Sequence, residues 1–345
     1  YMINVLIQTI QYDFIDKNAT MRAKIHSINK LDKLLRSSIF LTFEQTQFLF
    51  NSFHQQANYT NMTIQEPFYV AGDIHGSYTD LSNLLQQIGL RQLFTNTQLI
   101  FVGDYTDRGS QGVEVLQMLL YLNFLGANIH LIKGNHENLR INQKYGFYKE
   151  FLTKFQGQNF SLILDFYDKL TLFMIVNNNF ICHGGAPIAH DSFSFTGDFV
   201  RDVLWSDPRN QTGITPSKRG AGKNYGAAEN NAFLERNSLK KVIRGHEAVT
   251  NLRDDFGDQK HFTVFSASRY SDDISGNVGF FVKVRGDEVM QIKLDGESVN
   301  RLANAFSVEL IFANAAGVAF LAYATVYLAK MRIMQGKLKK SKIYG

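Results

Sequence analysis

The sequence predicts an α/β protein in which short buried strands alternate with amphipathic helices. From Phe68 onward, short apolar runs alternate with stretches of helical periodicity in the order β-α-β-α-β. Polar residues follow directly on these runs, as they do at the ligand-binding edge of α/β sheets. Hydrophobic residues make up 45% of the 345-residue chain, which is enough for a large buried core.

The first 66 residues are expected to form a helical region that caps a larger domain. Apolar residues recur at helical spacing over Met21–Phe40. Thr42 and Gln45 fit a capping box that opens a second helix, which continues through Phe53.

A second domain is expected over residues 67–300, where strand and helix patterns alternate. Runs of β-branched and aromatic residues bounded by glycine are typical of buried strands, and apolar residues at helical spacing indicate the helices between them. The predicted strands are Phe68–Ala71, Leu99–Val102, Ile129–Ile132, Phe180–Cys182, Lys241–Ile243, Phe262–Phe265 and Val278–Val284, and the predicted helices are Tyr78–Ile88 and Val113–Phe124.

Composition excludes several classes of protein. The single cysteine, Cys182, rules out a disulfide framework and a cysteine-based zinc site. The net charge is +5, and the six basic residues that follow Ala329 exceed it, so the rest of the chain has no basic excess. We therefore expect no nucleic-acid partner. The first fifteen residues lack the basic segment and the cleavage site of a secretory signal, which favours an intracellular protein.

Metal-binding residue types follow five of the predicted strands. The segments are GDIHG (72–76), GDYTDRG (103–109), GNHE (134–137), HGG (183–185) and RGH (244–246). Oxygen and nitrogen donors without thiolate favour Mn, Fe or Zn at a catalytic centre. Six candidates are too many for one ion with an open position, and they suit two divalent ions that share a carboxylate. Four of the nine histidines, His75, His136, His183 and His246, stand in these segments together with aspartate and asparagine residues.

Two further groups in the second segment suit phosphoryl chemistry. The planar guanidinium of Arg108 can bind two phosphoryl oxygens. The carboxylate of Asp107 can orient a histidine that acts as a general acid.

In their order along the chain, these segments and WSDP (205–208) resemble the PPP family of serine/threonine protein phosphatases. INQKYGFY (141–148) and SKRGAGKNYG (217–226) are also similar to segments of that family, and the resemblance covers residues 40–295. It implies a metallophosphoesterase fold, a β-sandwich flanked by helices. It also implies metal-dependent hydrolysis of phosphoserine and phosphothreonine in phosphoprotein substrates.

The resemblance also implies a role for each site residue. Asp73, His75 and Asp104 would hold the first metal ion, and Asp104, Asn135, His183 and His246 would hold the second. Arg108, Arg219, Asn135 and Tyr270 would contact the substrate phosphate, and His136, oriented by Asp107, would protonate the leaving group.

The chain departs from the family pattern beside the site. Where the family has S-A-P-N-Y-C, this chain has SASRYS over residues 266–271, so that Ser271 replaces a reactive cysteine. Lys133 stands where the family has arginine. Both changes leave every predicted ligand in place, and they put the substrate groove and toxin sensitivity in question rather than the chemistry.

Two other functions fit part of the sequence. A nuclease or nucleotide hydrolase of the metallophosphoesterase type would usually carry a G-H-x-H pair, whereas RGHEAV has one histidine. The other alternative is a phosphatase-like structural subunit of a membrane assembly, because a fold does not by itself determine function.

The C-terminal sequence predicts a single transmembrane helix over residues 306–330. Its apolar segment, 308–329, is long enough to cross a bilayer and has small residues at a spacing that suits contact with partner helices. The basic tail, 331–345, would lie on the cytosolic or matrix side unless the chain is tail-anchored. We therefore expect a membrane-associated protein, with a mitochondrial membrane as one location.

Overall fold

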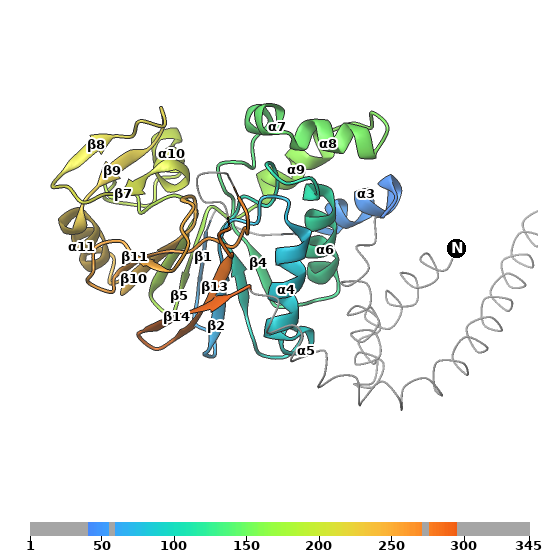
Figure 1. The fold of residues 1–345 in the computed structure, drawn as a ribbon. Helices are drawn as coiled ribbons and strands as arrows, with labels where there is room; N and C mark the ends of the chain where they lie inside the picture. The colour runs from blue at the N-terminus through green and yellow to red at the C-terminus, as the bar shows by residue number, and fades with distance from the viewer. Residues whose placement is uncertain (1–40, 55–58, 271–275, 295–345) are drawn as a thin grey trace, which may run out of the picture. The chain divides into compact units, whose positions relative to one another are not determined.

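The computed structural model describes residues 41–54, 59–270 and 276–294. Two β-sheets face each other, and helices cover their outer faces (Figure 1). The predicted α/β sandwich flanked by helices is therefore confirmed. The predicted helix Met21–Phe40, the transmembrane segment 306–330, the basic tail and Ser271 lie outside the described residues. No helix within the described ranges is long and apolar enough to span a bilayer.

The first sheet has five strands in the order β14-β13-β2-β3-β4. Strands β2, β3 and β4 are parallel, while β13 is antiparallel to both β2 and β14. Its strands are β2 (Phe68–Ala71), β3 (Leu99–Phe101), β4 (Ile129–Leu131), β13 (Phe280–Arg285) and β14 (Glu288–Lys293).

The second sheet has six strands in the order β1-β5-β6-β10-β12-β11, and β6, β10 and β12 are parallel. A separate three-stranded sheet has the order β7-β9-β8. The strands of these sheets are β1 (Tyr59–Met62), β5 (Phe173–Val176), β6 (Asn179–Cys182), β7 (Asp207–Pro208), β8 (Ile214–Pro216), β9 (Lys223–Tyr225), β10 (Lys241–Arg244), β11 (Arg253–Asp254) and β12 (His261–Thr263).

Helices cover the outer face of each large sheet (Figure 1). Those on the side of the five-stranded sheet are α3 (Phe43–Ser52), α4 (Tyr78–Ile88), α5 (Leu90–Leu93), α6 (Gly112–Phe124), α7 (Leu139–Tyr145), α8 (Phe147–Lys154) and α9 (Ser161–Lys169). On the side of the six-stranded sheet lie α10 (Gly197–Trp205) and α11 (Ala227–Arg236). Helix α3 begins with the predicted capping box, in which the Thr42 hydroxyl accepts from the Gln45 backbone N–H.

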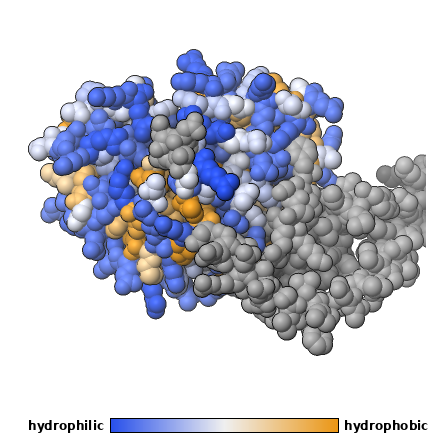
Figure 2. All heavy atoms as spheres, viewed as in Figure 1, coloured by the Kyte–Doolittle hydropathy of each residue, from blue (hydrophilic) through white to orange (hydrophobic). Residues whose placement is uncertain are grey.

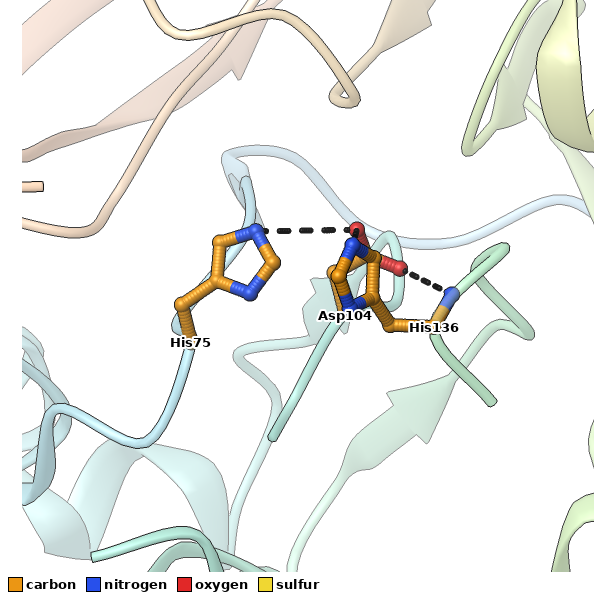
Figure 3. Close-up of side chains that lie close together, drawn as sticks. All are labelled: His75, Asp104 and His136. Atoms are coloured by element: carbon orange, nitrogen blue, oxygen red, sulfur yellow. Dashed lines mark hydrogen bonds and ion pairs between the residues drawn. The ribbon is translucent and has the colours of Figure 1, made fainter. Parts of the chain in front are cut away.

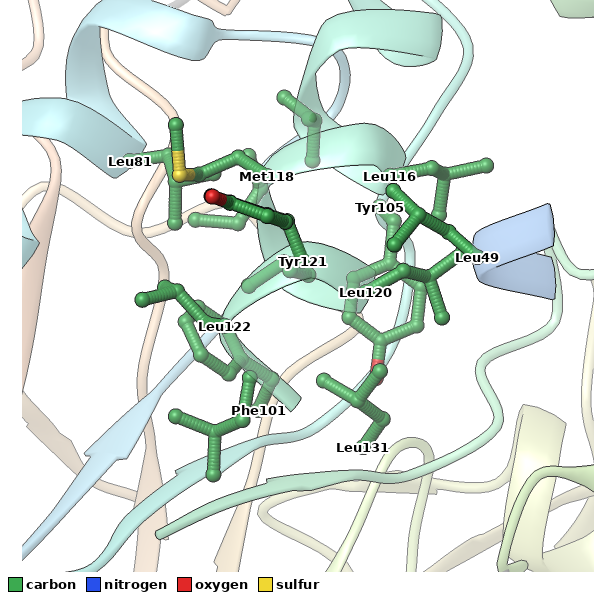
Figure 4. Packing of buried hydrophobic residues seen from close by; sticks show 14 of the residues in the cluster. Leu49, Leu81, Phe101, Tyr105, Leu116, Met118, Leu120, Tyr121, Leu122 and Leu131 are labelled. Atoms are coloured by element: carbon green, nitrogen blue, oxygen red, sulfur yellow. The ribbon is translucent and has the colours of Figure 1, made fainter. Parts of the chain in front are cut away.

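Strand alternation builds separate cores on the two faces of each sheet. In β3, Ile100 points into the apolar layer between the sheets, and Leu99 and Phe101 point toward the helices. Helix α6 packs Leu116 and Leu120 into that helical core (Figure 4). In Figure 2 the described surface is mostly hydrophilic, and a patch of hydrophobic residues lies in its lower centre.

The prediction of a helical region over residues 1–66 is wrong near its C-terminal end, because Tyr59–Met62 forms strand β1. This strand pairs with β5 in parallel, and the Tyr59 ring stacks on Phe173 at 5.1 Å between centroids. Strand pairing of this kind joins residues more than a hundred positions apart, so local periodicity does not reveal it. Five predicted strands otherwise match within one residue at each end, whereas β12 ends two residues and β13 begins two residues away from the prediction.

Candidate functional site

The polar segments that follow the strands converge at one edge of the two sheets. Strands β2, β3 and β4 lie side by side in parallel, and so do β6 and β10, so their carboxyl ends meet at the same edge. A bridge between Asp73 and Phe265 connects the end of β2 to the chain after β12. The prediction that the strand ends form one site is therefore consistent with the topology.

Asp104 lies at the centre of this site and is 2% exposed. Its Oδ2 is 3.7 Å from His75 Nε2, and its Oδ1 is 3.4 Å from His183 Nε2. The same Oδ1 accepts a hydrogen bond from the His136 backbone N–H at 2.9 Å (Figure 3). One carboxylate thus faces histidines from two different sheets.

The backbone of the site is strained where it presents these side chains. Twelve non-glycine residues with positive φ occur among the described residues, and five of them are His75, Asp104, Asp107, Arg108 and His246. Left-handed backbone is costly for residues other than glycine and persists where the surroundings fix it. Strain of this kind gathers at functional sites, and here it turns the chain sharply after β2, β3 and β10.

Gly134 is required for the close approach of β4 to Asp104. A Cβ atom at this position would collide with the Asp104 carboxylate and with its backbone nitrogen. The glycine of GNHE therefore lets the chain that carries His136 lie directly against Asp104.

Two of the histidines have a fixed tautomer. His75 Nδ1 donates to the Thr106 carbonyl, and His183 Nδ1 donates to the Val102 carbonyl, both at 3.0 Å. Because a carbonyl can only accept, the Nε2 atom of each neutral ring carries a lone pair. Both lone pairs are directed toward carboxylate or amide oxygens, which is the arrangement found around a bound cation.

The third histidine completes a group of acceptor atoms. His246 Nδ1 is 3.2 Å from His183 Nε2 and 3.1 Å from Asn135 Oδ1, and His183 Nε2 is 2.7 Å from the same oxygen. His246 is buried, and its Nε2 has no hydrogen-bond partner. Its backbone N–H donates to Asp73 Oδ1 at 2.9 Å, which ties the second candidate group to the first.

Burial of this cluster disfavours charge on the acids and on the histidines. Burial raises the pKa of Asp73 and of Asp104, and for Asp104 the negative charge of Asp73 raises the pKa further. Burial also lowers the pKa of His75, His183 and His246 well below the usual value. Neutral imidazoles beside buried carboxylates form a site whose charge a cation would balance.

The donor set therefore fits two divalent ions. Two groups of three residues hold ligand atoms within 4.8 Å of one another, namely His75–Asp104–His136 and Asp104–His183–His246. They share Asp104, as expected of a bridging carboxylate. Nitrogen and oxygen donors without sulfur suit Mn, Fe or Zn. The assignment of individual ligands stays a prediction.

His136 lies in this cluster, but its ring is held from the other side. His136 Nδ1 is 2.7 Å from Asp107 Oδ2, and its Nε2 is 3.8 Å from Asp104 Oδ2. Asp107 is fully buried and also accepts from the Asn142 side chain and from the Phe147 backbone N–H, each at 2.9 Å. The predicted His136–Asp107 pair is therefore present, with Nε2 directed toward the metal-binding groups.

The predicted phosphate-binding groups line the edge of the cluster. The Arg108 guanidinium is exposed and lies 4.0 Å from the centroid of Tyr145 and 5.7 Å from that of Tyr270. Tyr270 stacks on His75 at 4.9 Å, and burial raises the pKa of its hydroxyl to about 12. Its phenol is thus neutral at physiological pH and can donate a hydrogen bond.

Arg219 reaches the site through an acid that sequence reasoning missed. Arg219 Nε donates to Asp207 Oδ2 at 2.7 Å, and Asp207 Oδ1 lies 4.0 Å from His246 Nε2. Arg244, fully buried, donates to Asp207 Oδ1 at 2.9 Å. Asp207 belongs to the WSDP segment, so the motif was quoted but its ion pairs depend on the tertiary structure.

Glu137 is a second residue whose role the sequence did not reveal. Its carboxylate accepts from the backbone N–H groups of Asp104, Tyr105 and Gly134, at 2.9, 3.1 and 2.7 Å. Glu137 is 2% exposed and holds the turn after β3 against the turn after β4. The final residue of the GNHE segment therefore fixes the geometry of the site.

A family model described as calcineurin-like phosphoesterase matches residues 66–250. Among curated proteins, a probable serine/threonine-protein phosphatase of Encephalitozoon cuniculi is 37% identical over 217 residues, which cover 58% of this chain and 47% of that protein. Serine/threonine-protein phosphatase 5 of Homo sapiens is 32% identical over 246 residues, covering 67% of this chain and 48% of that protein. The chain thus spans about half the length of the curated relatives it matches.

A solved structure of a protein serine/threonine phosphatase from Saccharomyces cerevisiae matches with a TM-score of 0.62 and 25% identity. The match covers 77% of this chain and 89% of that one. A cold-active protein-tyrosine phosphatase of a Shewanella species has a TM-score of 0.52 at 17% identity, which shows a shared fold alone. These similarities agree with the predicted metallophosphoesterase fold and with the resemblance to serine/threonine phosphatases.

Proposed function

The chain belongs to the calcineurin-like phosphoesterase family, and we propose that it hydrolyses phosphoserine and phosphothreonine esters in proteins. The observation that carries this proposal is the position of Asp104. Its carboxylate is shared by two clusters of candidate metal ligands, beside a histidine oriented by a buried acid and an exposed arginine. That combination serves phosphoryl transfer to water.

Asp73, His75 and Asp104 would hold one ion, and Asp104, Asn135, His183 and His246 would hold the other. Divalent ions at these residues would polarise the phosphoryl group and activate a water molecule as the nucleophile. We propose Mn, Fe or Zn, because the donors are imidazole, carboxylate and amide.

Arg108 and Arg219 would bind and orient the phosphoryl oxygens. The Arg108 guanidinium packs on Tyr145, which keeps its planar fork in place for two parallel hydrogen bonds. Asp207 fixes Arg219 through Nε and leaves its two terminal nitrogens available to the substrate. Tyr270 and Asn135 would add hydrogen bonds at the same oxygens.

His136 would protonate the leaving alkoxide. When the ring is doubly protonated, Nδ1–H donates to Asp107 and Nε2–H is directed into the site. Asn142 and the Phe147 backbone N–H hold Asp107 as a carboxylate in one orientation, and Tyr167 in turn donates to Asn142 at 3.0 Å. The proton is thus held at the atom that faces the substrate.

The test uses the full chain and a matched pair of variants. We expect phosphate release from phosphoserine and phosphothreonine peptides, loss of this activity in chelator, and two bound metal ions per chain. Asp104→Asn should lower both metal content and activity. Asp168→Asn removes the same charge at an exposed position on α9 and should change neither. Full activity in Asp104→Asn would contradict the shared-carboxylate site.

Attachment to a membrane is a separate proposal that rests on the sequence of residues 308–329. The apolar segment and the basic residues after it support a single span that packs against partner helices, in a membrane-associated intracellular protein. A mitochondrial membrane is the location we propose. Extraction of the full chain from membranes by alkaline carbonate without detergent would refute the span.

A further inference from the structure

Helix α7 has a buried side that bonds the candidate site and an exposed side that carries cations. On its buried side, Asn142 donates to Asp107 and to the His136 carbonyl, both at 2.9 Å. On its exposed side, Arg140 and Lys144 are four residues apart, so their side chains are neighbours on one face of the helix. The helix that positions the His136–Asp107 pair therefore also carries two exposed cations.

Lys144 lies close to the proposed phosphate site, and Arg140 is one turn before it on the same helix. Lys144 Nζ is 5.0 Å from the centroid of the Tyr145 ring, and the Arg108 guanidinium carbon is 4.0 Å from the same centroid. The charges of Lys144 and Arg108 are thus at most about 9 Å apart, which is comparable with the ~8 Å Debye length at physiological salt. The Tyr145 ring is itself 5.2 Å from the His136 ring, so Lys144 borders the place where His136 would act.

The cations beside the site form no ion pair within the described residues. Neither Arg108 nor Arg140 nor Lys144 forms an ion pair with a described carboxylate, whereas Lys154 on α8 pairs with both Glu114 and Glu150. The surface over α7 and α8 is mostly hydrophilic in Figure 2, with a few hydrophobic residues among the others. Because like charges at this spacing repel one another, a ligand that brings negative charge would relieve the repulsion.

We propose that Arg140 and Lys144 give this site a preference for phosphoprotein segments with an anionic side chain near the phosphorylated residue. The anion can be a carboxylate or a second phosphate, since both offer oxygens to a cation. An extended segment advances about 3.3 Å per residue, so the cations are within reach of a side chain roughly two or three residues from the phosphoresidue. This inference rests on the proposed phosphatase function.

The test compares three phosphoserine peptides that differ at positions two and three residues from the phosphoserine: glutamine, glutamate, or a second phosphoserine. The full chain is assayed on each, together with p-nitrophenyl phosphate, which has no flanking residues. We expect kcat/KM for the glutamate peptide to exceed that for the glutamine peptide by about two- to fivefold, as for an exposed ion pair, with loss of the difference at high salt.

The double variant Arg140→Gln, Lys144→Gln should reduce the ratio of kcat/KM for the glutamate peptide to kcat/KM for the glutamine peptide toward one. The matched control Lys240→Gln, Lys260→Gln removes the same charge from two exposed residues that precede β10 and β12, at the strand ends opposite the site, and should keep the ratio. If only the doubly phosphorylated peptide has a higher kcat/KM than the glutamine peptide, the preferred anion is a phosphate.

Two results separate the failure of this inference from that of the proposed function. Equal kcat/KM for all three peptides, or an unchanged ratio in the Arg140, Lys144 variant, overturns the substrate preference while phosphatase activity stands. Absence of hydrolysis of every peptide and of p-nitrophenyl phosphate by the metal-loaded protein overturns both.

Discussion

Replacing His136 by asparagine should separate protonation of the leaving group from every other contribution of the site. The substitution removes the imidazole that bonds Asp107, but the backbone N–H of residue 136 can still donate to Asp104 Oδ1. The contact that fixes Asp104 therefore does not depend on the side chain. We expect metal content to stay near that of the unmodified chain.

The magnitude follows from the role of the proton. General acid catalysis contributes about 100- to 10,000-fold, or roughly 2.7 to 5.5 kcal/mol in the activation free energy. Asp107→Asn should cost less, about 10- to 150-fold, which corresponds to one charge-assisted hydrogen bond. Asp107 accepts at both oxygens, so an amide in its place would set an N–H against a donor in either orientation. The double variant should lose little more than His136→Asn alone, since the two residues act as a unit.

The assay compares two leaving groups. A serine alkoxide needs a proton as the ester bond breaks, whereas p-nitrophenolate is stable without one. His136→Asn should therefore reduce kcat for a phosphoserine peptide by the full factor and kcat for p-nitrophenyl phosphate by much less. His130→Asn serves as the matched control, because His130 lies on β4 and bonds Gln98 at 2.7 Å.

Equal losses on the two substrates would refute the assignment of His136 as the acid. A parallel loss of bound metal would instead make His136 a ligand, in line with its membership in one of the three-residue clusters.

Three further predictions concern stability. Chelation should lower the melting temperature, because each ion held at 100 times its dissociation constant stabilises the fold by about 2.7 kcal/mol; an unchanged melting curve would contradict a resident metal centre. Ser268→Ala should cost about 1–3 kcal/mol in urea unfolding, since the Ser268 hydroxyl donates to buried Asp80 at 2.7 Å and accepts from the Gly279 N–H; a midpoint like that of the unmodified chain would show that the loop is held elsewhere. Burial raises the pKa of Asp255, but the His261 hydrogen bond and the charges of His261 and Arg253 outweigh it and lower the pKa from 3.8 to about 2. The folded state thus gains about 2 kcal/mol from Asp255 above pH 4, and loses it as the pH falls toward 2. Asp255→Asn should therefore flatten the pH dependence of unfolding below pH 5, and unaltered curves would argue against the shifted pKa.

The strands that carry the site were predictable because their signals are local. Leu99 to Val102 are all buried and are followed at once by Gly103 and Asp104, a pattern that a short window of sequence reveals. Strand β1 gave no such signal. Its four residues alternate between exposed and half-buried positions, and only the pairing with β5 makes them a strand.

The residues that support the site were harder to predict than those expected to perform the chemistry. Glu137 and Asp207 stand inside quoted motifs. However, a carboxylate that accepts from three backbone N–H groups, or one that bonds three arginines, cannot be told from any other acid in a sequence. Asn142 likewise stands in the quoted INQKYGFY segment, but its residue type does not reveal its hydrogen-bond partners. Hydrogen-bond partners of this kind come from different elements, and only packing brings them together.

By itself, the sequence determined the fold class, the order of the polar segments and the donor types, because each depends on residues close together in the chain. Only the tertiary structure decided that Asp104 faces histidines from both sheets, and that α7 holds Asp107 on one side and exposes Arg140 and Lys144 on the other. The physical reason is the parallel pairing of the strands: their carboxyl ends lie at one edge, so residues far apart in sequence come within a few ångströms of one another.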